Sequence, residues 1–232
     1  MRPRVVLVTD PSFGDDAIVR CSEAAAAALP FGAFCVQLRD KRRAVASLRL
    51  MAWRLRIATQ KAGGLLVLNG DPRLARDVGA DGVHLGGGAA AVAEARAILG
   101  RPGWISVAAH TDDDVRRATG EGADAVLVSP IFATRPLSPG GSGASSASSL
   151  LEKSSASSLL EKRPRGLAAL RSARAIAGAR PAVFALGGVT LDRVRSCADA
   201  GAEGVAVLRA LLTSHQPGIL ARAIHDVLAP RW

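Results

Sequence analysis

The chain alternates eight short apolar runs with eight longer amphipathic segments. The runs are rich in Val, Leu and Ala and almost free of charge, which predicts strands covered on both faces. The expected strands are Val5–Val8, Phe34–Leu38, Leu65–Leu68, Gly82–Leu85, Ile105–Ala108, Ala125–Val128, Ala182–Leu186 and Gly204–Leu208. The segments between them carry apolar residues at helical spacing. The expected helices are Asp15–Leu29, Val45–Ala62, Pro72–Val78, Ala90–Leu99, Asp112–Gly120, Leu167–Ala177, Leu191–Ala200 and Ala210–Leu228.

This strict alternation predicts an α/β fold in which a single (β/α)8 TIM barrel spans residues 1–232. The alternative is an open doubly wound sheet, which usually has a glycine-rich loop after its first strand. Here the first loop, residues 9–15, reads TDPSFGD and is not a G-x-G-x-x-G motif. Related phrases at 79–82 (GADG), 122–124 (GAD) and 201–204 (GAEG) precede three strands. In each we expect the glycine to end a helix and the acid to cap the turn into a strand.

One segment interrupts the alternation. The nonapeptide SSASSLLEK at 145–153 is repeated at 154–162, directly after the Gly/Ser-rich residues 140–144. We expect a flexible, Ser-rich inserted loop over residues 140–165, after the sixth strand and within the barrel domain. A local duplication without function is the simpler interpretation, and a mobile lid over the active site is the alternative.

The charge balance is strongly basic, with 30 Lys and Arg against 20 Asp and Glu, a net charge of +10. The basic residues are mostly dispersed arginines and form no run of five, so we interpret them as solvated surface and expect no nucleic-acid partner. The low aromatic content of 3% also disfavours stacking on single-stranded bases. A net positive field favours a small anionic substrate such as a phosphate ester.

The three cysteines, Cys21, Cys35 and Cys197, are widely spaced and predict neither a disulfide framework nor a zinc site. No apolar run reaches membrane-spanning length. The run Val5–Val8 is too short for a signal peptide and is followed at once by Thr9 and Asp10. We therefore expect a cytoplasmic protein without a membrane partner. The oligomeric state stays open.

In a TIM barrel the active site lies at the C-terminal ends of the strands. Gln37, Arg39 and Lys41 follow one another at period two from the second strand, which places an amide and two cations on one side to bind an anion. Gly187-Gly188 and residues 208–210 follow strands seven and eight, where such barrels commonly bind a phosphate. The alternatives are surface charge for the cations and a tight turn for the glycines. We expect His84 to be structural and His110 to lie nearer the site.

Several strand-end motifs, in order, resemble those of the thiamine-phosphate synthase/TenI family over nearly the whole chain. The matching stretches are residues 8–10 (VTD), 36–41 (VQLRDK), 66–69 (LVLN), 79–86 (GADGVHLG), 129–134 (SPIFAT), 185–189 (ALGGV) and 204–207 (GVAV). The resemblance implies an enzyme of thiamine biosynthesis. It also implies that Gln37, Arg39, Lys41 and Asn69 hold a pyrimidine pyrophosphate, with Arg39 and Lys41 as the catalytic residues.

The same resemblance implies a second subsite for a phosphorylated thiazole. Its expected residues are Gly187, Gly188, Leu208 and Arg209. Ser129, Thr134 and Arg135 are further expected substrate-binding residues, with Arg135 in place of a lysine that usually follows the threonine. Arg209 stands where the family has a serine, and Ala108 replaces another.

The family's two magnesium-binding aspartates correspond to Gly70 and Ala89, so oxygen ligands for the metal are missing at both. The histidine of a TenI-type thiazole tautomerase corresponds to Pro130. We therefore expect a TenI-like member that acts on or beside phosphorylated hydroxyethylthiazole without a metal or other cofactor. One alternative is a true synthase that couples aminopyrimidine methyl pyrophosphate to thiazole phosphate, with Mg²⁺ as cofactor and Asp71 or Asp40 replacing the missing ligands. The other is a non-catalytic barrel that binds a thiamine precursor.

Overall fold

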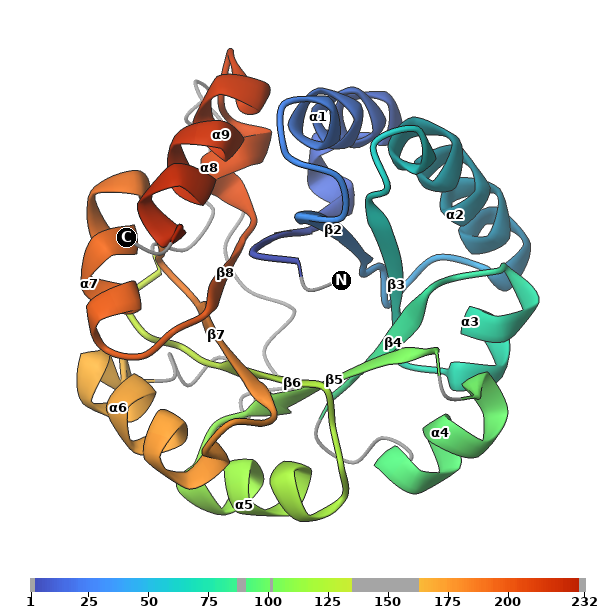
Figure 1. The fold of residues 1–232 in the computed structure, drawn as a ribbon. Coiled ribbons are helices and arrows are strands. Elements are labelled where there is room, and N and C mark those ends of the chain that lie inside the picture. Colours follow the sequence, from blue (N-terminus) through green and yellow to red (C-terminus); the bar gives the residue numbers. More distant parts are fainter. Residues whose placement is uncertain (1–2, 87–90, 101, 135–162, 230–232) are drawn as a thin grey trace, which may run out of the picture.

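The structure, a computed structural model, describes residues 3–86, 91–100, 102–134 and 163–229. Eight parallel strands close into a barrel in the order β1 to β8, and helices surround them (Figure 1). The strands are β1 Val5–Val8, β2 Phe34–Leu38, β3 Leu65–Asn69, β4 Gly82–Leu85, β5 Trp104–Ala109, β6 Ala125–Val128, β7 Ala182–Leu186 and β8 Gly204–Val207. The predicted (β/α)8 barrel is confirmed, and each predicted strand lies within two residues of its observed bounds at either end.

The helices follow the predicted order. They are α1 Asp15–Ala27, α2 Val45–Gln60, α3 Pro72–Asp77, α4 Val92–Leu99, α5 Asp112–Gly120, α6 Gly166–Ala177, α7 Leu191–Asp199, α8 Arg209–Leu212 and α9 Pro217–Leu228, with a 3-10 turn η1 at Pro11–Phe13. The single last helix predicted over Ala210–Leu228 is wrong, because the segment is broken into α8 and α9. Pro217 disfavours helical geometry at Gln216, whose φ and ψ are −134° and 65°. The Gln216 N–H donates instead to the hydroxyl of Ser214 at 3.1 Å.

Alternate residues of each strand face two separate apolar layers. One layer fills the space between sheet and helices, for example with Val36, Leu68 and Ile105. The other fills the inside of the barrel and includes Val6, Val8, Cys35, Val67, Ala125, Leu127, Ala182, Phe184 and Ala206. Trp104 and Phe184 meet edge-on in this inner layer, with ring centroids 6.4 Å apart. Apolar side chains therefore close the lumen and leave its C-terminal end for polar groups.

The repeated Gly-Ala-acid phrases end helices as predicted. Gly79, Gly122 and Gly201 all have positive φ, at 65°, 77° and 97°. The two aspartates then reach across to the neighbouring strand. Asp81 accepts a hydrogen bond from the N–H of Leu66 at 2.7 Å, and Asp124 accepts one from Ile105 at 2.9 Å. These acids therefore satisfy backbone groups at the N-terminal end of the barrel.

The predicted insertion lies mostly outside the described residues, since only 163–165 of the stretch 140–165 are among them. Arg165, the last residue of this stretch, is bound to the barrel. Its N–H donates to the carbonyl of Pro130 at 2.8 Å, and its guanidinium lies 2.9 Å from Asp112.

All three cysteines are buried and unpaired. Burial raises the pKa of the Cys21 and Cys197 thiols to about 11 and that of Cys35 further still. The thiols are therefore neutral at ordinary pH. Of the helices in the described parts of the chain, none has the length and apolar character needed to cross a membrane.

Candidate active site

A layer of polar side chains closes the inside of the barrel at the C-terminal ends of β2 to β5. Strand alternation places Gln37, Asn69, His84 and Ser106 on the same side as the inner apolar layer. Gln37 Nε2 donates to Asn69 Oδ1 at 3.2 Å, and His84 Nδ1 lies 2.9 Å from Ser106 Oγ. The structure thus brings together two residues predicted for pyrimidine binding, Gln37 and Asn69.

His84 is buried in this layer and is uncharged at neutral pH. Burial, and then the positive charges of Arg39 and His110, lower the pKa of its imidazole to about 4. His84 therefore stays uncharged, as expected for a structural histidine. The charges of Arg39 and His110 act on it because all three residues lie towards the C-terminal ends of their strands.

His110 follows directly after β5 and lies against the end of the next strand. Its Nδ1 is 2.9 Å from the carbonyl oxygen of Ser129 and 3.3 Å from the hydroxyl of the same residue. Its backbone N–H donates to a carboxylate oxygen of Asp114 at 2.8 Å, and Asp114 also closes the capping box that begins α5 with Thr111. Ser129, a predicted substrate-binding residue, is thus engaged with His110.

A cavity of about 800 Å³ opens at the same end of the barrel. The loops after β1, β2, β6, β7 and β8 supply its walls. Its lining includes Asp10, Arg39, Thr134, Gly187, Gly188, Arg193, Leu208 and Arg209. Five of the predicted substrate-binding residues, Thr134, Gly187, Gly188, Leu208 and Arg209, therefore lie around one cavity, together with Arg39 from the predicted pyrophosphate site.

Gly187 and Gly188 form a turn that packs against the loop after β6. Their φ angles are +98° and +63°, a region that favours glycine. A Cβ on Gly187 would lie 2.9 Å from Cα of Pro130, and one on Gly188 would lie 2.7 Å from the carbonyl oxygen of Ala133. The glycines therefore form both a tight turn and a wall of the cavity, so the two interpretations of this motif are compatible.

Arg193 of α7 was not predicted and holds this glycine turn. Its Nη1 donates to the carbonyl of Gly188 at 2.8 Å, and its guanidinium carbon lies 4.7 Å from the centre of the Phe132 ring. In the sequence Arg193 is one more arginine in the first turn of an amphipathic helix. Only the three-dimensional structure distinguishes it from the surface arginines.

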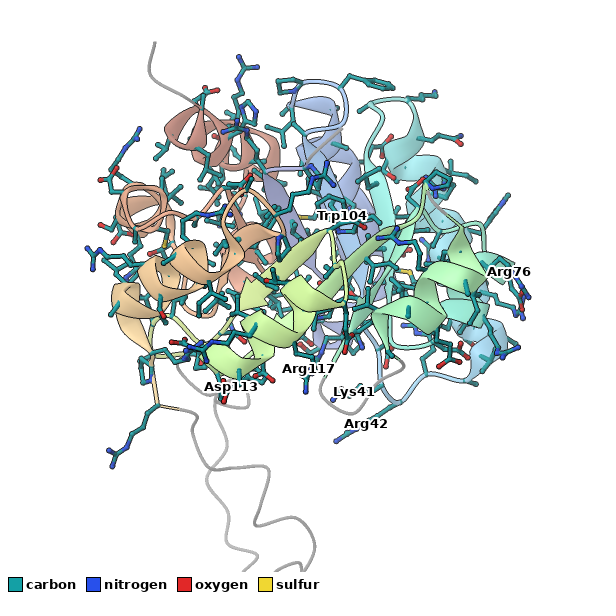
Figure 2. All side chains as sticks on the ribbon, turned by 60° about the horizontal axis from the view of Figure 1, so that its bottom comes forward. Lys41, Arg42, Arg76, Trp104, Asp113 and Arg117 are labelled. Carbon is teal, nitrogen blue, oxygen red and sulfur yellow. The ribbon has the colours of Figure 1, made fainter. Side chains whose placement is uncertain are left out.

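The loop after β2 carries Arg39 at the cavity and Lys41 at the surface. The N–H of Arg39 donates to the hydroxyl of Thr9 at 2.8 Å. Lys41 is exposed, is not among the lining residues of the cavity, and lies near Arg42 at the lower edge of Figure 2. The structure therefore separates the two predicted catalytic cations.

Arg43 fixes the same loop to the start of α1. Its guanidinium binds Asp15 through two contacts, of 2.5 and 2.7 Å, and Asp40 through one of 2.9 Å. The hydrogen bond from Arg43 lowers the pKa of Asp15. Burial acts to raise the pKa of Asp40, but hydrogen bonds from Arg43 and the backbone outweigh it and leave that pKa lowered. Asp40 is thus fully engaged and is a poor replacement for a metal ligand.

The residues on the Asn69 side do not fit a magnesium ion. Gly70 has no side chain, and its N–H donates to the carbonyl of His84 at 3.0 Å. Asp71 is exposed and caps α3, where its carboxylate accepts from the N–H of Arg73 at 2.7 Å. Within the described ranges, no three His, Cys, Asp or Glu side chains are grouped as metal ligands. Ala89 and Arg135 lie outside those ranges.

Comparison with known proteins places this barrel in a family. Residues 5–137 match the family described as thiamine monophosphate synthase. The chain is 38% identical over 204 residues to the thiamine-phosphate synthase of Methanoculleus marisnigri, covering 85% of this chain and 83% of that protein. It is 34% identical over 223 residues to that of Methanoregula boonei, covering 96% and 91%.

The fold is also similar to that of the thiamine phosphate pyrophosphorylase from Pyrococcus furiosus. The TM-score is 0.74 at 21% identity, over 97% of this chain and 95% of that one. The sequence matches and the shared barrel agree, and the chain belongs to the thiamine monophosphate synthase family of thiamine-biosynthesis enzymes.

Proposed function

We propose that this chain acts on a phosphorylated hydroxyethylthiazole as a TenI-like, magnesium-independent member of the family, catalysing a proton shift within the thiazole. The observation that carries the proposal is the contrast between the two ends of the site. A cavity suited to a phosphate is built around Gly187 and Gly188, whereas the described residues on the Asn69 side offer no carboxylate free to hold a metal.

The thiazole end has the properties of an anion site. Arg39, Arg193 and Arg209 line the same cavity, so its field favours a phosphate ester. Guanidinium groups form short, charge-assisted hydrogen bonds with phosphate oxygens. Gly187 and Gly188 also line this cavity, so their backbone borders the space that a phosphate would fill. In this proposal these groups hold the phosphate and thereby orient the thiazole ring.

The Asn69 side of the site, where the pyrophosphate is expected, gives little support to a reaction that needs magnesium. Magnesium gives up its bound water reluctantly and needs well-placed oxygen ligands. Gly70 supplies none, and Asp71 is engaged in capping α3. The proposed proton shift therefore uses no metal.

A second candidate is the synthase reaction, in which aminopyrimidine methyl pyrophosphate and thiazole phosphate form thiamine phosphate and release pyrophosphate. It is favoured by the Gln37–Asn69 hydrogen bond, by Arg39 at the cavity, and by the names of the relatives. Without a metal, only cations such as Arg39 and Lys41 would stabilise the departing pyrophosphate.

The test is a proton-shift assay on the purified chain. The non-aromatic tautomer of the phosphorylated thiazole is incubated in D₂O and followed by proton NMR, with and without EDTA. We expect conversion to the aromatic thiazole well above the spontaneous rate, unchanged by EDTA, with deuterium entering the product. Conversion at the spontaneous rate would overturn the proposal. Tight binding of the thiazole phosphate without turnover would then identify a non-catalytic binding barrel.

A further inference from the structure

Two histidines, His84 and His110, lie towards the mouth of the barrel, and they differ in the group that contacts the Nδ1 atom of each ring. His84 is buried against Ser106, whose hydroxyl can donate or accept a hydrogen bond. His110 is half-buried, and its Nδ1 lies 2.9 Å from the backbone carbonyl of Ser129. A carbonyl can only accept. The hydroxyl of Ser129 is farther from Nδ1, at 3.3 Å, so the closer carbonyl contact favours the tautomer with the proton on Nδ1.

The Ser129 carbonyl fixes the neutral tautomer of His110. A proton on Nδ1 makes a hydrogen bond with this oxygen, whereas a lone pair there would face the oxygen's own lone pairs. In the neutral ring Nε2 consequently carries the lone pair and is the basic atom. The backbone N–H of His110 is held at the same time by Asp114 at 2.8 Å, which anchors the residue on the start of α5. This arrangement is that of an oriented general base.

His110 is not among the residues that line the phosphate cavity, but it contacts the start of the loop after β6, which supplies Ala133 and Thr134 to that lining. Its ring contacts Ser129, and the next residue, Pro130, packs against the glycine turn, with its Cα 2.9 Å from where a Cβ of Gly187 would lie. The expected TenI histidine corresponds to Pro130, which has no acid-base group. The imidazole of His110, which directly follows β5, thus contacts the residue that precedes Pro130 in the chain.

We propose that His110 is the catalytic acid-base of this chain, with Nε2 moving the proton of the thiazole. The assignment rests on the proposed function. Nε2 takes a proton from a ring carbon, and the C–H electron pair moves into the conjugated system. The imidazolium then returns a proton from Nε2 to another carbon of the same system. No atom or electron is gained or lost, so the step needs no co-reactant.

Two other groups at the mouth bear on the charge of His110. The charges of Arg39 and His110 both disfavour protonation of His84, so His84 is neutral when His110 becomes an imidazolium. Asp114 contacts the backbone of His110 rather than its ring. His84 is therefore a poor competitor for the proton, and a single imidazole performs the transfer.

The decisive variant is His110→Asn. The Asn amide nitrogen replaces Nδ1 and keeps the hydrogen bond to the Ser129 carbonyl, but no group replaces Nε2. We expect at least a 100-fold loss of the rate of proton shift, with thiazole-phosphate affinity within two-fold of wild type. A structural role for His110 predicts the opposite, since His110→Asn would retain the rate. The exposed His215 supplies the control, and His215→Asn should have the wild-type rate.

Two further measurements test the role of His110 even if the Asn variant misfolds, and they distinguish failure of this role from failure of the proposed function. Added imidazole should restore part of the rate of His110→Ala, and an unrescued variant that still binds thiazole phosphate would contradict the proposal. In the wild-type protein, ¹⁵N NMR should show a neutral His110 with its proton on Nδ1, and thiazole phosphate should shift its Nε2 signal. An Nε2–H tautomer, or an Nε2 signal unmoved by saturating ligand, would overturn the role of His110 even if the chain catalyses the proton shift. If the wild type catalyses no proton shift, both proposals are overturned together.

Discussion

The imidazole Nδ1 of His84 lies 2.9 Å from the hydroxyl oxygen of Ser106, across the β4–β5 pair and inside the barrel. The two residues are neighbours in the strand register, and both are buried. Burial and nearby positive charge keep this histidine neutral, with a pKa of about 4. The pair thus completes the polar layer with an uncharged group, and it makes the stability of the fold depend on pH.

We predict that the free energy of unfolding falls as the pH is lowered from 6.5 towards 4. Unfolded His84 takes up a proton below its ordinary pKa of 6.5, whereas folded His84 does so only near 4, so the unfolded state binds more protons within this window. The loss amounts to about 3 kcal/mol. Urea unfolding across this pH range measures it. His84→Asn should remove most of the slope, and an undiminished slope in that variant would assign it to another group.

The Arg43 contacts should be measurable in a lower pH window. We expect Arg43→Met to lower the free energy of unfolding by about 1–2 kcal/mol at pH 7, because it removes bonds to both Asp15 and Asp40. The pKa of each carboxyl is lowered in the fold, so this stabilisation is present above about pH 4 and is lost as the pH falls through the lowered values. The difference between variant and wild type should therefore shrink in acid.

The exposed pair of Arg116 and Asp113 is the matched control for Arg43. We expect Arg116→Met to cost about 0.5 kcal/mol or less at pH 7, because solvent screens an exposed ion pair. Equal losses for the two variants would show that Arg43 is also an ordinary surface arginine.

Gly188→Ala should damage the glycine turn for two separable reasons. An alanine at φ +63° is strained, and its Cβ would meet the Ala133 carbonyl at 2.7 Å. Gly178→Ala is the matched control, since Gly178 has φ +57° but no heavy atom within 4 Å of its added Cβ. We expect the control to lose about 1–2 kcal/mol and Gly188→Ala to lose about 1–3 kcal/mol more. Equal losses in thermal or urea unfolding would show that the neighbouring loop gives way freely.

Arg209→Ala should weaken the binding of thiazole phosphate by at least several-fold. Arg209 lines the cavity beside Gly187 and Gly188, and a charge-assisted contact with a phosphate is lost when its guanidinium is removed. The unphosphorylated thiazole alcohol serves as the control ligand, and its affinity should not change. Calorimetry with both ligands decides the matter, and an equal affinity of variant and wild type for the phosphate would exclude Arg209 from the site.

The barrel could be predicted from sequence because each buried strand is a short apolar run, and because residues such as Gly122 and Asp124 end helices and begin strands by local rules. The break between α8 and α9 was missed, although Pro217 signalled it, because the apolar spacing continues on both sides. Contacts between side chains on neighbouring strands could not be predicted from the sequence. Ser106 lies within an apolar run, and nothing local connects it to His84.

The same limit applies to the candidate site. The C-terminal ends of the strands identified Arg39, Gly187 and Arg209, because barrel geometry brings all strand ends to one face. Local spacing could not separate Lys41 from Arg39, since the path of the loop decides which cation reaches the cavity. Arg193 was missed for the same reason: its role depends on a carbonyl that the chain places beside it only after folding.

The most direct test of the central claim is the rate of pyrophosphate release from aminopyrimidine methyl pyrophosphate and thiazole phosphate, measured with Mg²⁺ and with EDTA. Because Gly70 offers no ligand and Asp71 caps α3, we predict a slow rate that Mg²⁺ does not raise. The double variant Gly70→Asp with Ala89→Asp should gain a Mg²⁺-dependent rate if an aspartate is tolerated at the φ of +111° of residue 70 and the rest of the pyrophosphate site is intact. Rapid, Mg²⁺-dependent formation of thiamine phosphate by the unmodified chain would contradict the account and establish the synthase reaction instead.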